Sequence, residues 1–255
     1  MGTEMTEALH AEWTKARTVP ATMWLLAGAV ALTILLSALV TASTRCGSPA
    51  SCGADPAKIS LTGIYLGQAV VGVLAVLVIS DEYSTGMIRV TLAAIPSRGM
   101  VLTAKGAVVT GMVLVAGIIA VLPSVLMGRM ILPGNGLAFP AAGPVLRVTV
   151  GSILYLGLIG LLSLGVATMV RDSAVAIGIV LSLLFVFPII AHFVTDPIWQ
   201  RHLEQIGPMT AGMAIQDTVD LANQPISPWA GLGVLAAWAA GALLLGRLVL
   251  TLRDA

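Results

Sequence analysis

Six long runs of apolar residues divide the chain, and no Asp, Glu, Lys, Arg or His falls inside any of them. A helix of about 20 residues, rising about 1.5 Å per residue, can cross a hydrocarbon layer of about 30 Å. Membrane strands would be shorter and would alternate apolar with polar positions, and an open sheet would leave backbone groups unpaired in lipid. The pattern therefore predicts an all-α bundle with transmembrane helices at residues 23–42, 60–80, 106–128, 148–170, 173–191 and 229–246.

The composition supports a membrane protein. The 255 residues are 58% hydrophobic and 10% charged, and the mean hydropathy is +1.00. A single soluble core cannot hide that much apolar surface from water. The net charge of +1 gives no reason to expect a nucleic-acid partner held by charge. We expect one integral membrane domain over residues 21–255, preceded by a separate segment at 1–20.

The basic residues set the expected orientation. With both termini in the cytoplasm, the external side carries only Arg45, Lys58, Arg129, Arg147 and Arg201, and the other Lys and Arg residues are inside. The only two cysteines, Cys46 and Cys52, then fall in the first external loop, within "CGSPASC". That loop faces an oxidising compartment, so we expect a disulfide that braces it. Two free thiols are the alternative.

The segment "EMTEALHAEWTKAR" predicts an interfacial helix within residues 1–20. Its apolar residues recur at helical spacing, with Trp13 expected at headgroup depth and Lys15 and Arg17 toward lipid phosphates. Glu12 falls on or beside the apolar face, where a carboxylate is costly unless it is paired. Two interpretations remain open: a cationic neighbour from another segment, or a local pair with Lys15 in a solvated helix.

The later connections carry weaker signals. Between the fifth and sixth spans, "DPIWQRHLEQIG" and "TAGMAIQDTVDLAN" each predict a short amphipathic external helix. Pro123 and Pro188 lie toward the outer ends of their spans, where they either kink the helix or are simply tolerated. Arg171 and Asp172 predict a tight cytoplasmic hairpin.

Several kinds of chemistry are disfavoured by the sequence. A secondary transporter needs ionisable groups near the bilayer midplane, and the spans have none. An intramembrane hydrolase would have to use Ser163 and His192, whose expected depths differ, and no supporting motif surrounds the serine. A metal site from His192, Asp196, His202 and Glu204 is permitted by residue type, but loop polarity explains these residues more simply. We therefore expect no catalytic residues and no metal. The chain also lacks a GxxxxGK[ST] phosphate loop, so any ATP would be hydrolysed by another polypeptide.

The segment from Asp81 to Arg98, "DEYSTGMIRVTLAAIPSR", predicts a short helix under the bilayer. Tyr83 and Met87 belong to an apolar stripe, while Glu82, Thr85 and Arg89 form a polar side. Gly86 would permit close backbone approach, and Pro96 would end the helix. Such a helix is well shaped to dock on a cytosolic partner, and a solvated loop is the alternative.

At these residues the sequence resembles the ABC-2 type permeases of ABC transporters. The resemblance rests on "EYSTGMIRVTLAAIPSRGMVLTAK" and on "LHAEWTKART", which is similar to the family's N-terminal interface helix through Glu12, Trp13 and Lys15. Met87 departs from the family, which usually has threonine there. The residues that match the family's coupling motif are Glu82, Gly86, Arg89, Thr91, Leu92, Pro96, Arg98 and Lys105.

The resemblance implies a bacterial plasma-membrane subunit that dimerises with a second permease copy and pairs with two separate ATPase subunits. ATP and Mg would bind to those subunits, and this chain would hold no cofactor. The coupling helix would transmit ATPase closure to the bundle, and the cargo would be a drug, antibiotic, peptide or other amphipathic molecule. A non-transporting membrane scaffold or immunity protein is the rival interpretation, with an intramembrane enzyme behind it.

A Gly-x-x-x-Gly pattern, Gly63 and Gly67, lies in the second span and suits tight helix contact. We expect it to pack near the dimer axis, and lipid-facing glycines are the alternative.

Overall fold

The computed structural model describes residues 2–45, 55–87, 91 and 98–252, and within them the chain contains helices and loops but no strand. Six of the described helices are long and apolar enough to cross a membrane, as the sequence predicts. They are α2 (Pro20–Ser43), α5 (Ile64–Ser84), α7 (Arg98–Ile131), α8 (Ala142–Val170), the composite of α9 (Ser173–Leu181) with α10 (Phe187–Phe193), and α13 (Pro228–Leu252). Cys46 and Cys52 lie outside the described residues, and so does their predicted disulfide.

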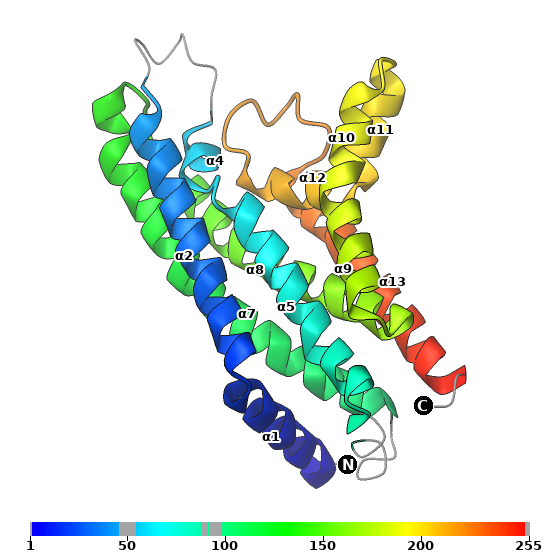
Figure 1. Ribbon diagram of the computed structural model, residues 1–255. Helices are drawn as coiled ribbons and strands as arrows, with labels where there is room; N and C mark the ends of the chain where they lie inside the picture. Colours follow the sequence, from blue (N-terminus) through cyan, green and yellow to red (C-terminus); the bar gives the residue numbers. More distant parts are fainter. Residues whose placement is uncertain (1, 46–54, 88–90, 92–97, 253–255) are drawn as a thin grey trace.

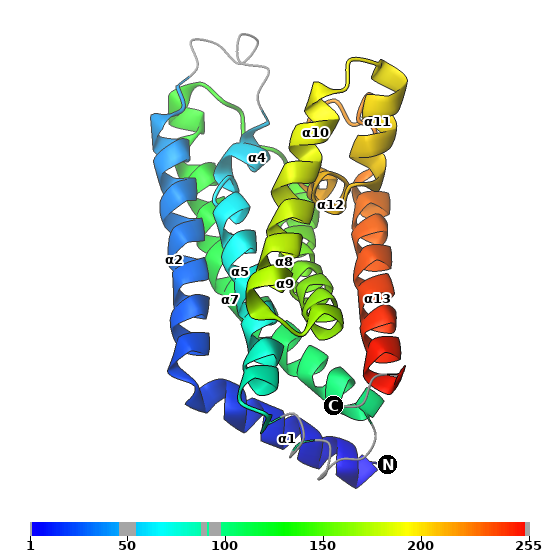
Figure 2. The same ribbon diagram turned by 45° about the vertical axis from the view of Figure 1, so that its right-hand side comes forward.

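The spans run side by side, with short elements at both ends of the bundle (Figure 1). At one end α1 (Gly2–Thr18) crosses beneath the spans, at the end of the bundle where α13 also ends. At the other end lie α4 (Pro56–Ser60), α11 (Pro197–Ile206) and α12 (Pro208–Met213), as the turned view also shows (Figure 2). The two ends of the chain therefore lie on the same side of the bundle.

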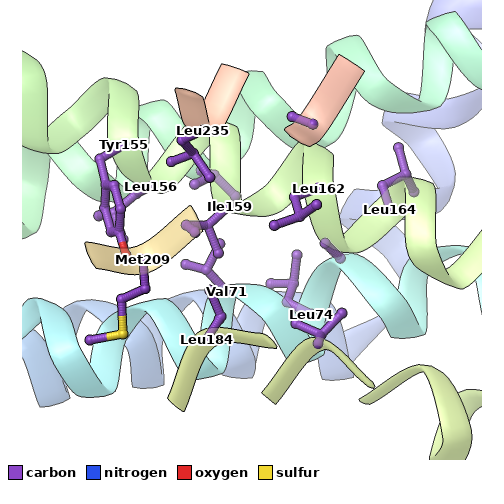
Figure 3. Close-up of a cluster of buried hydrophobic side chains, with 14 of the residues drawn as sticks. Val71, Leu74, Tyr155, Leu156, Ile159, Leu162, Leu164, Leu184, Met209 and Leu235 are labelled. Carbon is purple, nitrogen blue, oxygen red and sulfur yellow. The ribbon is translucent and has the colours of Figure 1, made fainter. Parts of the chain in front are cut away.

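Helix α8 forms the centre of the bundle. Its apolar stretch is 67% buried, against 22% for α2, because α8 packs against α5, α7, α9 and α13. Figure 3 shows how Tyr155, Leu156 and Ile159 of α8 meet side chains from the surrounding helices, among them Val71 of α5 and Leu235 of α13. A central apolar helix of this kind gives the chain one core.

A buried amide lies in this core. The Tyr155 hydroxyl donates to Gln68 Oε1, and Gln68 Nε2 donates to Met209 Sδ at 3.4 Å. All three residues are buried, so these hydrogen bonds satisfy groups that would otherwise be costly in an apolar interior. They also join α5, α8 and α12.

Gly63 and Gly67 lie where α5 crosses α2. A Cβ on Gly63 would lie 1.9 Å from the Thr33 carbonyl oxygen, and one on Gly67 would lie 2.2 Å from Thr33 Oγ1. Ser37 Oγ also accepts a hydrogen bond from the Gly63 backbone N–H at 3.0 Å. The glycines are buried rather than facing lipid, and their close contact is with α2 of the same chain.

Several helix boundaries differ from the prediction. Helix α7 begins at Arg98 rather than at 106, and α8 begins at Ala142 rather than at 148. A charge at a span's end does not stop a helix when it reaches a partner or the interface. Helix α7 also passes through Pro123 without ending, whereas the π-helical turn Ser182–Val186 comes just before Pro188. Pro188 lacks the N–H that would bond to the preceding turn, and the π-helical turn includes the residues that lose this bond.

The external helices are partly as predicted. Asp196 caps α11, because its carboxylate accepts a hydrogen bond from the Ile198 N–H at 2.8 Å. The second predicted short helix is present in the first half of its segment only: α12 starts at Pro208, and helical structure ends with the 3-10 turn Ala214–Gln216. Asp217 is extended and Asp220 has a φ of 53°, which a helix cannot accommodate.

Candidate functional site

Four charged residues meet where the end of α5 joins α1 and the start of α7. We call Glu12, Lys15, Glu82 and Lys105 the charged cluster. Lys105 is only 1% exposed, Glu12 is 5% exposed and Glu82 is 6% exposed. The cluster lies at the end of the bundle that also carries the two ends of the chain (Figure 1). Burial of this many charges in so apolar a chain requires that they neutralise one another.

The cluster pairs every charge with an opposite one. Lys105 Nζ lies 2.5 Å from Glu12 Oε2 and 2.9 Å from Glu82 Oε1. Lys15 Nζ lies 3.0 Å from Glu12 Oε1 and 2.9 Å from Glu82 Oε1, and it also donates to Thr91 Oγ1 at 3.2 Å. The prediction of a cationic neighbour from another segment is confirmed by Lys105. Glu12 also pairs locally with Lys15, but it is buried, so the alternative of a solvated helix is wrong.

Helix α1 packs against the bundle through the face that carries Glu12. Ala8, Glu12 and Ala16 are buried, and α1 makes its main contacts with α7. Trp13 is 48% exposed and does not belong to this buried face. Burial lowers the pKa of Lys15, but its hydrogen bonds to Glu82 and Glu12 outweigh that effect, so the pKa lies above the usual 10.5. Lys15 therefore remains an ammonium at neutral pH.

The predicted coupling segment begins differently from expectation. Asp81, Glu82 and Tyr83 continue α5, which ends at Ser84, so the expectation of a new helix from Asp81 was wrong. Glu82 consequently faces the interior and not the solvated side. The helical conformation is interrupted at Gly86, whose φ of 72° is readily adopted only by glycine. A Cβ there would meet nothing within 4 Å, so backbone conformation explains this glycine and close approach does not.

Only part of the remaining segment is described. Met87 and Thr91 are helical, and the Met87 side chain is 45% exposed. Arg89, Leu92 and Pro96 lie outside the described residues, and Arg98 is described only as the first residue of α7. A separate coupling helix between α5 and α7 stays a prediction.

Tyr83 links the end of α5 to the hairpin between α8 and α9. The Arg171 guanidinium carbon lies 5.3 Å from the centre of the Tyr83 ring, a distance typical of a cation–π contact. Arg171 has a φ of 63°, and Asp172 caps α9 by accepting from the Val175 N–H at 2.8 Å. The predicted tight turn is therefore present, and through Arg171 it contacts Tyr83, the residue after Glu82 in α5.

A second polar network, which the sequence interpretation missed, lies at the opposite end of the bundle. Asp55 caps α4 through the Ala57 N–H at 3.0 Å, and it also accepts from Thr218 Oγ1 at 2.6 Å and the Val219 N–H at 3.1 Å. Lys58 forms an ion pair with Asp217. Burial raises the pKa of Asp217, although the nearby Lys58 ammonium acts in the opposite direction. The Asp-Pro sequence at 55–56 was a helix-start signal that could have identified Asp55.

The residues considered for an intramembrane hydrolase or a metal site lie in different surroundings from one another. Ser163 is buried in α8 and donates to the Ile159 carbonyl at 2.8 Å, while His192 is exposed on α10. Asp196 caps α11, and Glu204 accepts from Gln200 Nε2 at 3.3 Å. Within the described part of the chain, no three His, Cys, Asp or Glu side chains are grouped to hold a metal ion.

Comparison with known families supports the interpretation based on the motif. A family model described as an ABC-2 family transporter protein matches residues 8–195, which is well over half of the chain. Comparison with curated proteins found no match. The matched region includes all four residues of the charged cluster and five of the six spans. The chain belongs to the ABC-2 family of transporter proteins and is a multi-pass membrane permease.

Proposed function

We propose that this permease is the membrane subunit of an ATP-driven exporter in the bacterial plasma membrane. A separate ABC ATPase would supply the energy, with ATP and Mg bound to that subunit and no cofactor on this chain. Two ATPase subunits and a second permease copy would complete the transporter. Helix α1, the end of α5, the start of α7 and the end of α13 share one side of the bundle, which we assign to the cytoplasm (Figure 2). Lys15, Arg17 and Arg171 belong to that side, in line with the positive-inside rule.

The charged cluster is the observation that carries this proposal. The segment that follows α5 is the expected docking site of the ATPase, and Glu82 lies only four residues before Gly86, where α5 has ended. Through Glu82, the end of α5 is fixed to Lys105 of α7 and to Lys15 of α1. Separating these partners would leave buried charges unpaired, which is strongly unfavourable. A displacement of the segment would therefore move α1, α5 and α7 together.

The substrate that fits such a bundle is hydrophobic or amphipathic. The spans between the two polar networks carry apolar side chains, hydroxyls and the Gln68 amide, and they offer no midplane charge to select an ion. A drug, an antibiotic or a lipid-like peptide meets this requirement.

The proposal is tested by co-purification with a candidate ATPase and by measuring ATP hydrolysis in proteoliposomes. Met87→Glu alters an exposed side chain of the coupling segment, and we expect it to abolish permease-stimulated hydrolysis without loss of membrane insertion. The matched control is Leu221→Glu, which changes an exposed leucine two residues after Val219 of the second polar network, at the opposite end of the bundle. Arg89→Ala should act like Met87→Glu.

Other outcomes would reject the proposal. If no P-loop ATPase is stimulated by the wild-type chain, a non-transporting scaffold or immunity protein becomes the better interpretation. If Met87→Glu and Leu221→Glu have equal effects, the docking site is not at the segment that follows α5.

A further inference from the structure

A cavity of about 410 Å³ lies against the charged cluster. It is enclosed by α1, the start of α2, the last turns of α5 and the first part of α7. Exposed residues, including Val19 and Asp81, lie at its mouth, whereas Glu82, Lys105 and Val109 are buried within it. The volume is in the range of pockets that bind small molecules.

One carboxylate oxygen in this cavity lacks a partner. Glu82 Oε1 accepts from both Lys15 and Lys105, but the buried Oε2 has no hydrogen-bond partner among the described residues. All three N–H groups of Lys15 are already directed to Glu12, Glu82 and Thr91. An unpaired buried carboxylate oxygen is costly, so Glu82 Oε2 is a ready acceptor for a donor on a molecule bound in the cavity.

The charges around the cavity indicate that this donor is a cation. The described lining contains three acids, Glu12, Asp81 and Glu82, against two bases, Lys15 and Lys105. The Asp81 carboxylate, at the mouth, makes no ion pair with another described residue, and it stands one position from Glu82. A primary ammonium has three N–H donors and can bond to both acids at once. A metal ion fits less well, because no three acidic side chains in the described ranges are grouped to coordinate one.

The rest of the lining combines hydroxyl residues, Thr18, Thr22, Ser84 and Thr85, with apolar side chains. Val19, Val78 and Val108 line the cavity beside the polar groups. The mouth adjoins the junction of α1 and α2, where Trp24 is 77% exposed, as expected of an interfacial tryptophan. An occupant with a small ammonium head and an apolar body would fill both parts.

We propose that this cavity binds the headgroup of a membrane aminophospholipid such as phosphatidylethanolamine. The ammonium hydrogen-bonds to Glu82 Oε2 and to Asp81, and the acyl chains leave through the mouth into the bilayer. Phosphatidylcholine cannot replace it, because its trimethylammonium group has no N–H donor. Phosphatidylserine binds more weakly, because its carboxylate meets a lining that already has excess negative charge. The proposal does not rest on ATP-driven export, since it concerns the permease alone.

The test measures the thermal unfolding midpoint of the full chain in nanodiscs that differ only in headgroup. We expect a midpoint about 3 °C or more higher in phosphatidylethanolamine than in phosphatidylcholine of the same acyl chains. Val108→Phe fills the cavity without changing any charge and should remove this difference. The matched control is Val115→Phe on the same helix, where the side chain is 58% exposed and outside the cavity lining. Asp81→Asn should reduce the difference.

Three results would overturn the proposal. Equal midpoints in the two lipids would show that the N–H donors are not recognised. A preference for phosphatidylethanolamine that survives Val108→Phe would place the lipid elsewhere on the protein. Stabilisation by dodecylammonium in phosphatidylcholine nanodiscs, with no response to phosphatidylethanolamine, would identify the occupant as a soluble cationic amphiphile.

Discussion

Lys105→Met tests whether the charged cluster holds three helices together. Methionine keeps most of the side-chain length but removes the ammonium that lies 2.5 Å from Glu12 and 2.9 Å from Glu82. Both carboxylates are nearly fully buried, so two negative charges would be left with Lys15 as their only cation among the described residues. Breaking a buried ion pair by removing one partner costs about 3–5 kcal/mol. For a chain of this size about 1 kcal/mol corresponds to about 2–4 °C, so the unfolding midpoint should fall by about 6–20 °C.

The assay is differential scanning fluorimetry of purified protein in one fixed detergent or nanodisc. Lys15→Met is the matched control, because the Lys15 side chain is 30% exposed and its loss leaves Lys105 in place. Its midpoint should fall by about 4 °C or less, since partly exposed pairs contribute about 1 kcal/mol or less. The double variant Glu12→Gln with Lys105→Met should be more stable than Lys105→Met alone, because it also removes one unpaired carboxylate.

Two results would refute this reasoning. A change of less than about 2 °C for Lys105→Met would show that the carboxylates do not need this ammonium. Equal losses for Lys105→Met and Lys15→Met would show that burial does not decide the strength of the pairs.

Three further predictions concern other parts of the chain. Gly63→Ala should destabilise the protein by about 1–3 kcal/mol, because the new Cβ would lie 1.9 Å from the Thr33 carbonyl oxygen. The control is Gly28→Ala, whose Cβ would meet no heavy atom within 4 Å and which should leave the unfolding midpoint unchanged. Asp55→Asn should speed hydrogen exchange at the Thr218 and Val219 amides, which donate to this carboxylate, and unchanged exchange would contradict the second network. Because the pKa of Lys15 is raised in the folded state, the stabilisation from the Lys15 ammonium is complete below pH 10.5 and is lost as the pH rises through the folded-state pKa. The unfolding midpoints of wild type and Lys15→Met should therefore converge at high pH.

The sequence predicted the number, type and order of the spans because the signal is simple. A run of about 20 apolar residues without charge has few alternatives to a membrane helix. The boundaries were less accurate because they were placed at the first charged residue. Lys105 illustrates the reason: it was assigned to the loop before the third span, but α7 carries it into the interior, where two carboxylates compensate it.

The site was partly accessible from the sequence. The cost of placing Glu12 on an apolar face predicted a cationic partner, and the structure supplies that partner as Lys105. The inward position of Glu82 was not predicted, because a helical stripe drawn from Asp81 assumed a new helix where α5 in fact continues. The Gln68–Tyr155 contact was also missed, since charge-free spans were treated as uniformly apolar and an amide has no local signal that identifies its partner.

The most direct test of the proposed function is a crosslink from the coupling segment. A photo-crosslinking amino acid at position 87, where the Met87 side chain is exposed, should form an adduct with the ABC ATPase subunit in intact cells. The same probe at position 221, on an exposed leucine beside the second polar network, should form none. An ATPase adduct from position 221, or none from position 87 in a complex that hydrolyses ATP, would contradict the account.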